Sequence, residues 1–131
     1  MTWHDFLVDR KLGHEDVALG IAFMFGVDVS RVVVSEDITE AEAAQVNCVL
    51  HHIDGEFQTV VEVYVDDKRL ECLPALPTIA RFAEKLGCTC LVSDDSPNPY
   101  SWMLVDSAGR ARQVFLDAEE LDEHERYVLR R

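Results

Sequence analysis

Apolar residues first recur at helical spacing between residues 14 and 25. Val17, Ile21, Met24 and Phe25 follow the helical period, and Gly26 stands where a left-handed C-cap is expected. The spacing therefore predicts a helix over residues 14–25.

A second helical stripe lies between Pro74 and Gly87. Its apolar positions fall at i, i+3, i+4 and i+7, and they are Ile79, Phe82, Ala83 and Leu86. Proline is favoured at the start of a helix and glycine just past its end, so this pattern also predicts a helix. Near the N-terminus, Thr2 followed by Asp5 resembles a capping box and predicts a further, short helix that includes Phe6 and Leu7 and is separated from the next helix by Gly13.

Strand-like runs are the other repeated pattern. Residues 46–53 and 56–65 flank the Asp54-Gly55 dipeptide, which favours a tight hairpin turn. Such a turn would set His52 opposite Phe57 and leave the face that carries Cys48 for the core. Further β-branched or apolar runs cover residues 31–35, 88–92, 100–105 and 110–116.

The expected order is helix, helix, three strands, helix and three strands. Short connections favour an α+β fold with an antiparallel or mixed sheet of about six strands and the helices on one face. The length of 131 residues suits a single domain over residues 1–131. Two segments stay open: residues 36–45 are a loop or a short helix, and the acidic tail 117–131 is helix, strand or disordered.

Charge narrows the classes of partner. The chain holds 25 acidic and 12 basic residues, a net charge of −13. This field repels nucleic-acid phosphate and anionic membranes and attracts basic proteins, so we expect a basic protein partner, no nucleic acid and no membrane. The sequence shows no apolar run of membrane-spanning length and no secretory signal, which predicts a cytoplasmic location. The oligomeric state is open, with a dimer among the alternatives.

Residues for cofactor chemistry are sparse. The four cysteines, Cys48, Cys72, Cys88 and Cys90, lack the spacing of a zinc site and fall in apolar segments, which predicts packed thiols. There is no glycine-rich phosphate loop and no nucleophile elbow. We therefore expect no metal, no cofactor and no catalytic residue.

The outward face of the 46–65 hairpin is one candidate ligand face. It would carry His51, Gln58, Glu62 and Tyr64. An imidazole beside a carboxylate can serve in general acid–base chemistry. Since adjacent strand residues point to opposite faces, His51 and His52 cannot jointly hold a metal.

The segment from Asp94 to Trp102 is the leading candidate for partner binding. Asp94 and Asp95 precede two prolines, which stiffen a loop and lower its ordering cost on binding. Tyr100 and Trp102 follow on one face of the next strand. Aromatic anchors beside carboxylates suit a basic protein surface.

The stretch from Cys90 to Val105, with the helix before it and the hairpin after it, resembles small acidic bacterial immunity proteins of polymorphic toxin systems. The resemblance implies a non-catalytic protein that neutralises a basic partner toxin by steric and electrostatic occlusion, and it implies no particular fold. A secretion chaperone that binds an extended chain is an alternative. A small enzyme or ligand-binding domain that uses the His51 and Glu62 face is another.

Overall fold

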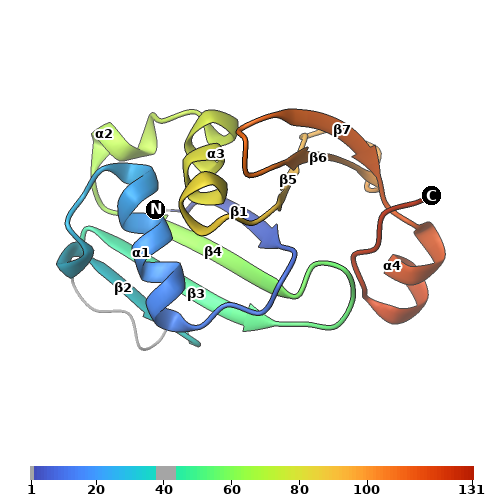
Figure 1. Cartoon of the computed structure of the whole chain (residues 1–131), viewed down its shortest axis with the longest axis horizontal. Helices are drawn as coiled ribbons and strands as arrows, with labels where there is room; N and C mark the ends of the chain where they lie inside the picture. The colour runs from blue at the N-terminus through green and yellow to red at the C-terminus, as the bar shows by residue number, and fades with distance from the viewer. Residues whose placement is uncertain (1, 38–43) are drawn as a thin grey trace.

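The computed structural model describes residues 2–37 and 44–131, so residues 38–43, which are most of the open segment 36–45, lie outside the described residues. A seven-stranded mixed sheet has the order β2-β3-β4-β1-β5-β6-β7, with only β2 and β3 parallel (Figure 1). The strands are β1 (Thr2–Val8), β2 (Val32–Ser35), β3 (Val46–His52), β4 (Thr59–Val65), β5 (Cys90–Ser93), β6 (Ser101–Val105) and β7 (Ala111–Phe115). The helices are α1 (His14–Phe25), α2 (Lys68–Glu71), α3 (Ala75–Leu86) and α4 (Ala118–His124), with a 3-10 turn η1 (Val29–Arg31). The predicted α+β class with a mixed sheet is confirmed.

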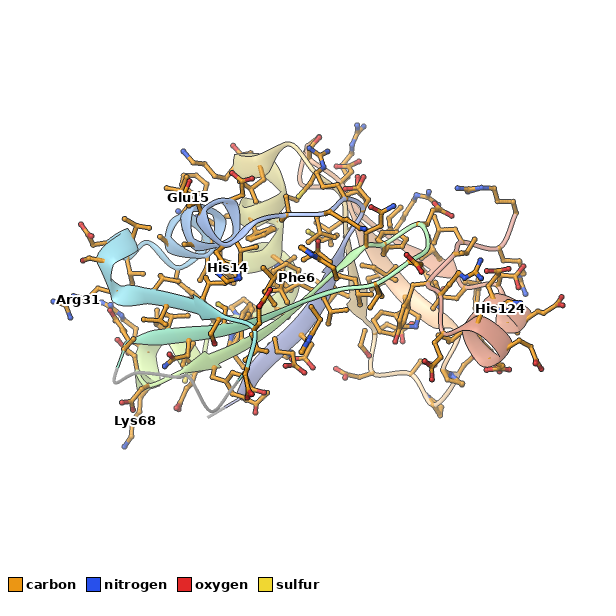
Figure 2. The ribbon with its side chains drawn as sticks, turned by 90° about the horizontal axis from the view of Figure 1, so that it is seen from below. Phe6, His14, Glu15, Arg31, Lys68 and His124 are labelled. Carbon is orange, nitrogen blue, oxygen red and sulfur yellow. The ribbon has the colours of Figure 1, made fainter. Side chains whose placement is uncertain are left out.

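The two long helices form one layer over the sheet. Helix α1 and helix α3 both end at a glycine in the left-handed conformation, Gly26 and Gly87, as their sequence patterns predict. Between helices and sheet lies the larger apolar cluster, in which Phe6 and Phe82 are fully buried and meet edge to face with ring centroids 4.9 Å apart. Figure 2 shows Phe6 in this layer beneath the helices. None of the helices in the described part of the chain is both long and apolar enough to cross a bilayer.

The C-terminal segment covers part of the opposite face. Leu7, Leu91, Leu104 and Val114 form a second apolar cluster there with Phe57 and Leu116, and Leu121 of α4 and Tyr127 pack against it. After α4, backbone bridges join Leu129 to Leu116 and Tyr127 to Gly55. The open question of the acidic tail is thus resolved: it folds as a helix and an extended segment (Figure 1).

The predicted short helix that begins at Thr2 is wrong, because Thr2–Val8 is strand β1. An isolated helix of that length is marginal, since nucleation is costly and few bonds repay it. As a strand the segment pairs with β4 on one side and β5 on the other. Phe6 faces the helices and Leu7 faces the second cluster, and both are buried. Central sheet pairing therefore overrides the local capping pattern of Thr2 and Asp5.

The predicted tight turn at Asp54-Gly55 is also wrong. Strands β3 and β4 pair as expected, but residues 53–58 connect them, and His52 lies opposite Thr59 instead of Phe57. The shift of two residues preserves which side chains face the core. Gly55 bridges Tyr127, and the Phe57 amide donates to the Tyr127 carbonyl over 3.4 Å. The connection is wider than predicted because it pairs with the C-terminal segment.

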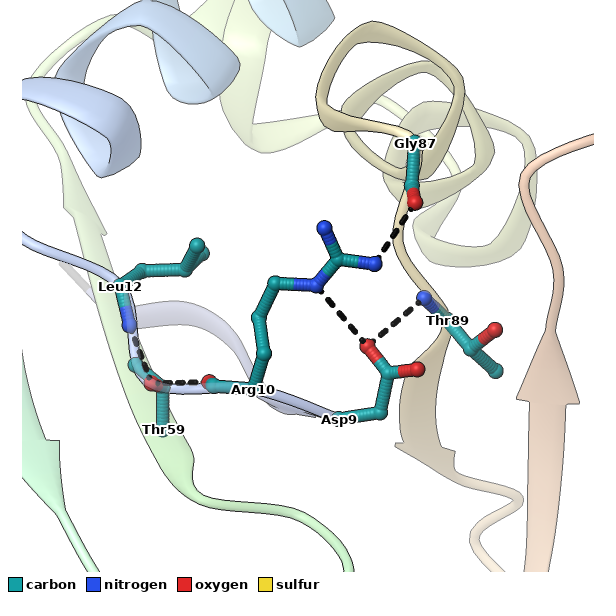
Figure 3. A network of polar contacts seen from close by, with 6 residues as sticks. All are labelled: Asp9, Arg10, Leu12, Thr59, Gly87 and Thr89. Atoms are coloured by element: carbon teal, nitrogen blue, oxygen red, sulfur yellow. Dashed lines mark hydrogen bonds and ion pairs between the residues drawn. The ribbon is translucent and has the colours of Figure 1, made fainter.

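A polar network fixes the connection between β1 and α1 (Figure 3). The buried Thr59 hydroxyl donates to the Arg10 carbonyl over 2.6 Å and accepts from the Leu12 amide over 3.0 Å. Arg10 in turn donates to the Gly87 carbonyl at the end of α3 over 2.8 Å, and Asp9 accepts from the Thr89 amide over 3.1 Å. These contacts join the end of β1 to β4, to α3 and to the start of β5.

Candidate functional site

The loop between β5 and β6 is ordered by its own side chains. Backbone amides donate to side-chain oxygens two residues earlier, which is the pattern of Asx and Ser turns. The pairs are Asp95 to Ser93 over 3.3 Å, Ser96 to Asp94 over 2.9 Å, Asn98 to Ser96 over 3.1 Å and Tyr100 to Asn98 over 3.0 Å. The loop therefore presents its carboxylates from a preformed backbone.

Asp94 is held by polar side chains of the sheet. The Ser101 hydroxyl donates to one carboxylate oxygen of Asp94, and the Gln113 amide donates to the Ser101 oxygen over 2.9 Å. The Ser101 hydrogen bond and then the Ser96 amide hold the pKa of Asp94 below its ordinary value. Asp94 therefore carries its negative charge at neutral pH in a fixed orientation.

Asp95 differs from its neighbour in being exposed. Its backbone φ of 58° lies in the left-handed region, which non-glycine residues adopt at a cost. Its carboxylate makes no hydrogen bond or ion pair with any residue that the structure describes. The loop thus holds an uncommitted negative charge in an unusual backbone conformation.

Beside these carboxylates lies a pocket of about 500 Å³, which we call the acidic pocket. Its apolar walls come from the start of α3 and from β5 and β6. The rest of its lining is polar and consists of His4, Ser93, Asp94 and Asp95. The apolar wall residues are Pro74, Ala75, Leu76, Pro77, Val92 and Met103. An apolar passage beside a carboxylate matches the alkyl stem and charged head of lysine or arginine.

Tyr100 and Trp102, which were predicted to bind the same partner, lie elsewhere. The Tyr100 hydroxyl donates to an Asp122 carboxylate oxygen over 2.6 Å, and the Trp102 ring meets the Tyr127 ring edge to face at 5.7 Å. Both aromatic side chains pack against the second apolar cluster, on the face opposite the helices. The structure therefore brings Asp94 and Asp95 together at the acidic pocket and assigns Tyr100 and Trp102 to anchoring the C-terminal segment.

The alternative ligand face is partly assembled. His51 Nε2 lies 3.4 Å from a Glu62 carboxylate oxygen, across the β3–β4 pair. Asp5 is the β1 partner of Glu62, and its pKa is raised by desolvation and then by the charge of Glu62. Desolvation, followed by these same two carboxylates, raises the pKa of the Tyr64 phenol. Three acidic or phenolic groups thus share the open part of this sheet face with one imidazole.

A second pocket of about 400 Å³ adjoins only one end of that face. Its lining is His51, Ile53, Val60, Leu121, Glu125 and Tyr127. Gln58 lies in the wide connection, where its side-chain amide donates to the Gly55 carbonyl over 3.2 Å. Of the four predicted ligand residues, therefore, His51 is the one that lines this pocket. His52 points the other way, as expected, and its Nε2 lies 2.7 Å from the Leu12 carbonyl.

Apart from Asp94 and Asp95, the residues that line the acidic pocket were not identified from the sequence. His4, Leu76 and Met103 come from β1, α3 and β6, and no local pattern marks them as neighbours. These residues lie close together because β1 is in the centre of the sheet, whereas the sequence pattern predicts a helix for this segment. Within residues 2–37 and 44–131, no three side chains of the His, Cys, Asp and Glu types are grouped to hold a metal ion.

Comparison of the chain with protein-family models, with curated proteins and with solved structures finds no match.

Proposed function

We propose that this chain is a non-catalytic protein-binding module that receives a basic side chain of a partner protein in the acidic pocket. The observation that carries the proposal is the pairing of apolar walls with an exposed, uncommitted Asp95 carboxylate beside the fixed Asp94. A preformed loop lowers the ordering cost of binding, and the net charge of −13 attracts a basic partner at long range.

The class of binder that fits best is an immunity protein that occludes a basic toxin. In this role Asp94 and Asp95 supply the recognition, while Tyr100 and Trp102 act indirectly by holding the C-terminal segment. A secretion chaperone would instead bind an unfolded, extended chain. The two roles separate in one assay, since an immunity protein binds a folded partner and suppresses its toxicity, whereas a chaperone does neither.

The binding site is tested with butylguanidinium, which carries the alkyl stem and head of arginine. Titration followed by NMR should produce saturable shifts at His4, Leu76 and Met103, and Asp95→Asn should weaken the binding about threefold to tenfold, since a charge-assisted contact contributes on the order of 1 kcal/mol. Glu123→Gln makes the same charge change on an exposed α4 residue and should leave the affinity unchanged. Shifts spread over all acidic residues without saturation would reject the site.

The partner is tested by capture on immobilised wild-type protein and on both variants, at low and high salt. A stoichiometric basic protein held by the wild type and by Glu123→Gln, but lost from Asp95→Asn and at high salt, would support the proposal. Equal recovery on all three baits would contradict it.

A second candidate function rests on the 400 Å³ pocket at His51. The His51–Glu62 contact orients an imidazole toward a partly apolar cavity, an arrangement suited to a small ligand or to acid–base chemistry. A ligand-observed NMR screen of small carboxylic acids and phenols should then find binders that His51→Ala removes. Binders unaffected by His51→Ala, or none at all, would reject this candidate.

A further inference from the structure

We propose that the outer edge of β7 binds an extended acidic segment of a partner chain by strand addition. This site is separate from the acidic pocket, and it does not depend on the function proposed above.

Strand β7 is the last strand of the sheet, and β6 is the one strand of the sheet that pairs with it. The Leu116 amide donates to the Tyr100 carbonyl and the Asp106 amide to the Arg110 carbonyl, so even-numbered residues direct their backbone groups toward β6. In an antiparallel pair the direction alternates from one residue to the next. Ala111 and Gln113 therefore direct their N–H and C=O groups away from the sheet.

The chain itself already uses the continuation of this edge. The Arg130 amide donates to the Phe115 carbonyl over 2.8 Å, and the Asp117 amide donates to the Val128 carbonyl over 2.8 Å. The backbone groups of Phe115 and Asp117 that make these bonds point away from β6, as expected for odd-numbered residues. The C-terminal segment thus pairs with the edge from Phe115 onward, while Ala111, Arg112 and Gln113 stay exposed. An added strand would continue the line of an existing pairing.

Charge selects the partner at this edge. In a chain of net charge −13, the cavity of about 340 Å³ here is lined by three arginines, Arg112, Arg130 and Arg131. Arg131 pairs with Glu56 at 2.7 Å. Arg112 and Arg130 pair with no carboxylate of the described chain, and Arg130 lies over the Phe115 ring at 5.0 Å from its centroid. Two guanidinium groups are thus available for carboxylates from outside.

The same charges argue against a second copy of this chain as the occupant. Pairing β7 with β7 of another molecule would bring Arg112 side chains near each other, and charged edge strands oppose such pairing. An acidic strand avoids this repulsion. Its backbone would bond to Ala111 and Gln113, and side chains on alternate positions would meet Arg112 on one face or Arg130 on the other.

The probe for the experiment is an acetylated and amidated nonapeptide of alternating valine and glutamate. A peptide of alternating valine and lysine is the control. Binding to the full chain is followed by NMR and by isothermal calorimetry at two salt concentrations. We expect the glutamate peptide to bind, to protect the Ala111 and Gln113 amides from hydrogen exchange, and to bind more weakly at high salt.

Two variants test the two parts of the site. Ala111→Pro removes an outward amide at an edge, where proline is tolerated, and should weaken binding at least tenfold. Arg112→Ser should weaken it about fivefold, with a smaller salt dependence. Arg31→Ser makes the same charge change on η1, at the opposite end of the molecule from α4 (Figure 2), and should bind like the wild type. Thermal unfolding checks that each variant is folded.

Several results would overturn the proposal. Equal binding of the lysine peptide would remove the charge argument, and unchanged binding by folded Ala111→Pro would remove strand addition. Binding of a single-stranded oligonucleotide with no amide protection would indicate a general anion site, and a concentration-dependent dimer that Ala111→Pro dissociates would make a second copy the occupant. Asp95→Asn should bind the glutamate peptide normally, so failure here and failure of the acidic pocket are distinguishable.

Discussion

Helix α1 crosses α3 at Gly20, and substitution of this glycine tests how tightly the helix layer is packed. Intrinsic helix propensity favours alanine over glycine by about 1 kcal/mol in a helix interior. Propensity alone therefore predicts that Gly20→Ala stabilises the protein. The structure predicts the opposite sign.

A Cβ atom on Gly20 would lie 2.5 Å from Phe82 Cε2 and 2.6 Å from Cδ2. The Phe82 ring is fully buried and packs edge to face against Phe6, so it has little room to move aside. Overpacking of this kind costs roughly 1–3 kcal/mol, and because two ring atoms are involved we take the upper half of that range. After the propensity gain, the net destabilisation is about 1–2 kcal/mol.

Urea unfolding followed by circular dichroism measures this difference, and the same loss should lower Tm by roughly 4–7 °C for a domain of this length. Gly13→Ala is the control for the added methyl group, since nothing lies within 4 Å of its Cβ. Gly13 is the N-cap of α1, where alanine caps less well than glycine but also lowers the entropy of the unfolded chain, so the stability should change by less than about 0.5 kcal/mol. The double variant Gly20→Ala/Phe82→Leu should be more stable than the sum of the single changes by about 1–2 kcal/mol. A raised midpoint for Gly20→Ala, or strict additivity in the double variant, would refute the steric reasoning.

Three further outcomes follow from contacts described above. Only Cys72 should react rapidly with a thiol reagent in the native protein, because the other cysteines are buried and burial raises the pKa of the Cys48 thiol to about 12; a second fast thiol would contradict this. Tyr100→Phe should raise amide exchange in α4 without altering α1, since the bond to Asp122 is lost; equal exchange in α4 would show that this bond does not hold the helix. The pKa of Asp94 is lower in the folded protein than its ordinary value of 3.8, so Asp94→Asn should lower the free energy of unfolding at neutral pH. This difference between wild type and variant should decrease to zero as the pH falls below 3.8, and a difference that persists in acid would exclude a charge effect.

Elements with local signals were predictable, and elements set by distant partners were not. The stripe of Ile79 and Phe82 and the caps at Gly26 and Gly87 depend on neighbours within a few residues, and the structure confirms them. Strand β1 depends on β4 and β5, which lie far along the chain at Thr59–Val65 and Cys90–Ser93. The capping-box pattern of Thr2 and Asp5 carried no information about those partners.

The candidate site divides in the same way. Asp94 and Asp95 stand out in the sequence because two prolines follow them and stiffen the loop, and in the structure this loop is ordered by its own hydrogen bonds. Tyr100 and Trp102 are predicted to bind a partner because aromatic side chains beside carboxylates suit a basic protein surface. Such side chains are equally suited to an internal contact, and the structure places them in one. The residues of the C-terminal segment that contact these two side chains, Asp122 and Tyr127, lie more than twenty residues further along the chain. Its pairing with Gly55 also explains why the hairpin register could not be read from the Asp54-Gly55 pair.

The central position of β1 has a consequence for how the protein reaches its folded state. The strands β2, β3 and β4 form one half of the sheet and β5, β6 and β7 the other, and β1 is the strand that lies between them. Before β1 inserts, β4 and β5 are both open edges, which are the sites where sheets aggregate. Pairings that span long stretches of chain also form slowly, because the loop must close before the contacts repay its entropy. Insertion of the first strand between the two halves is therefore the expected rate-limiting event, and the period before it is when the chain is most exposed to misassembly.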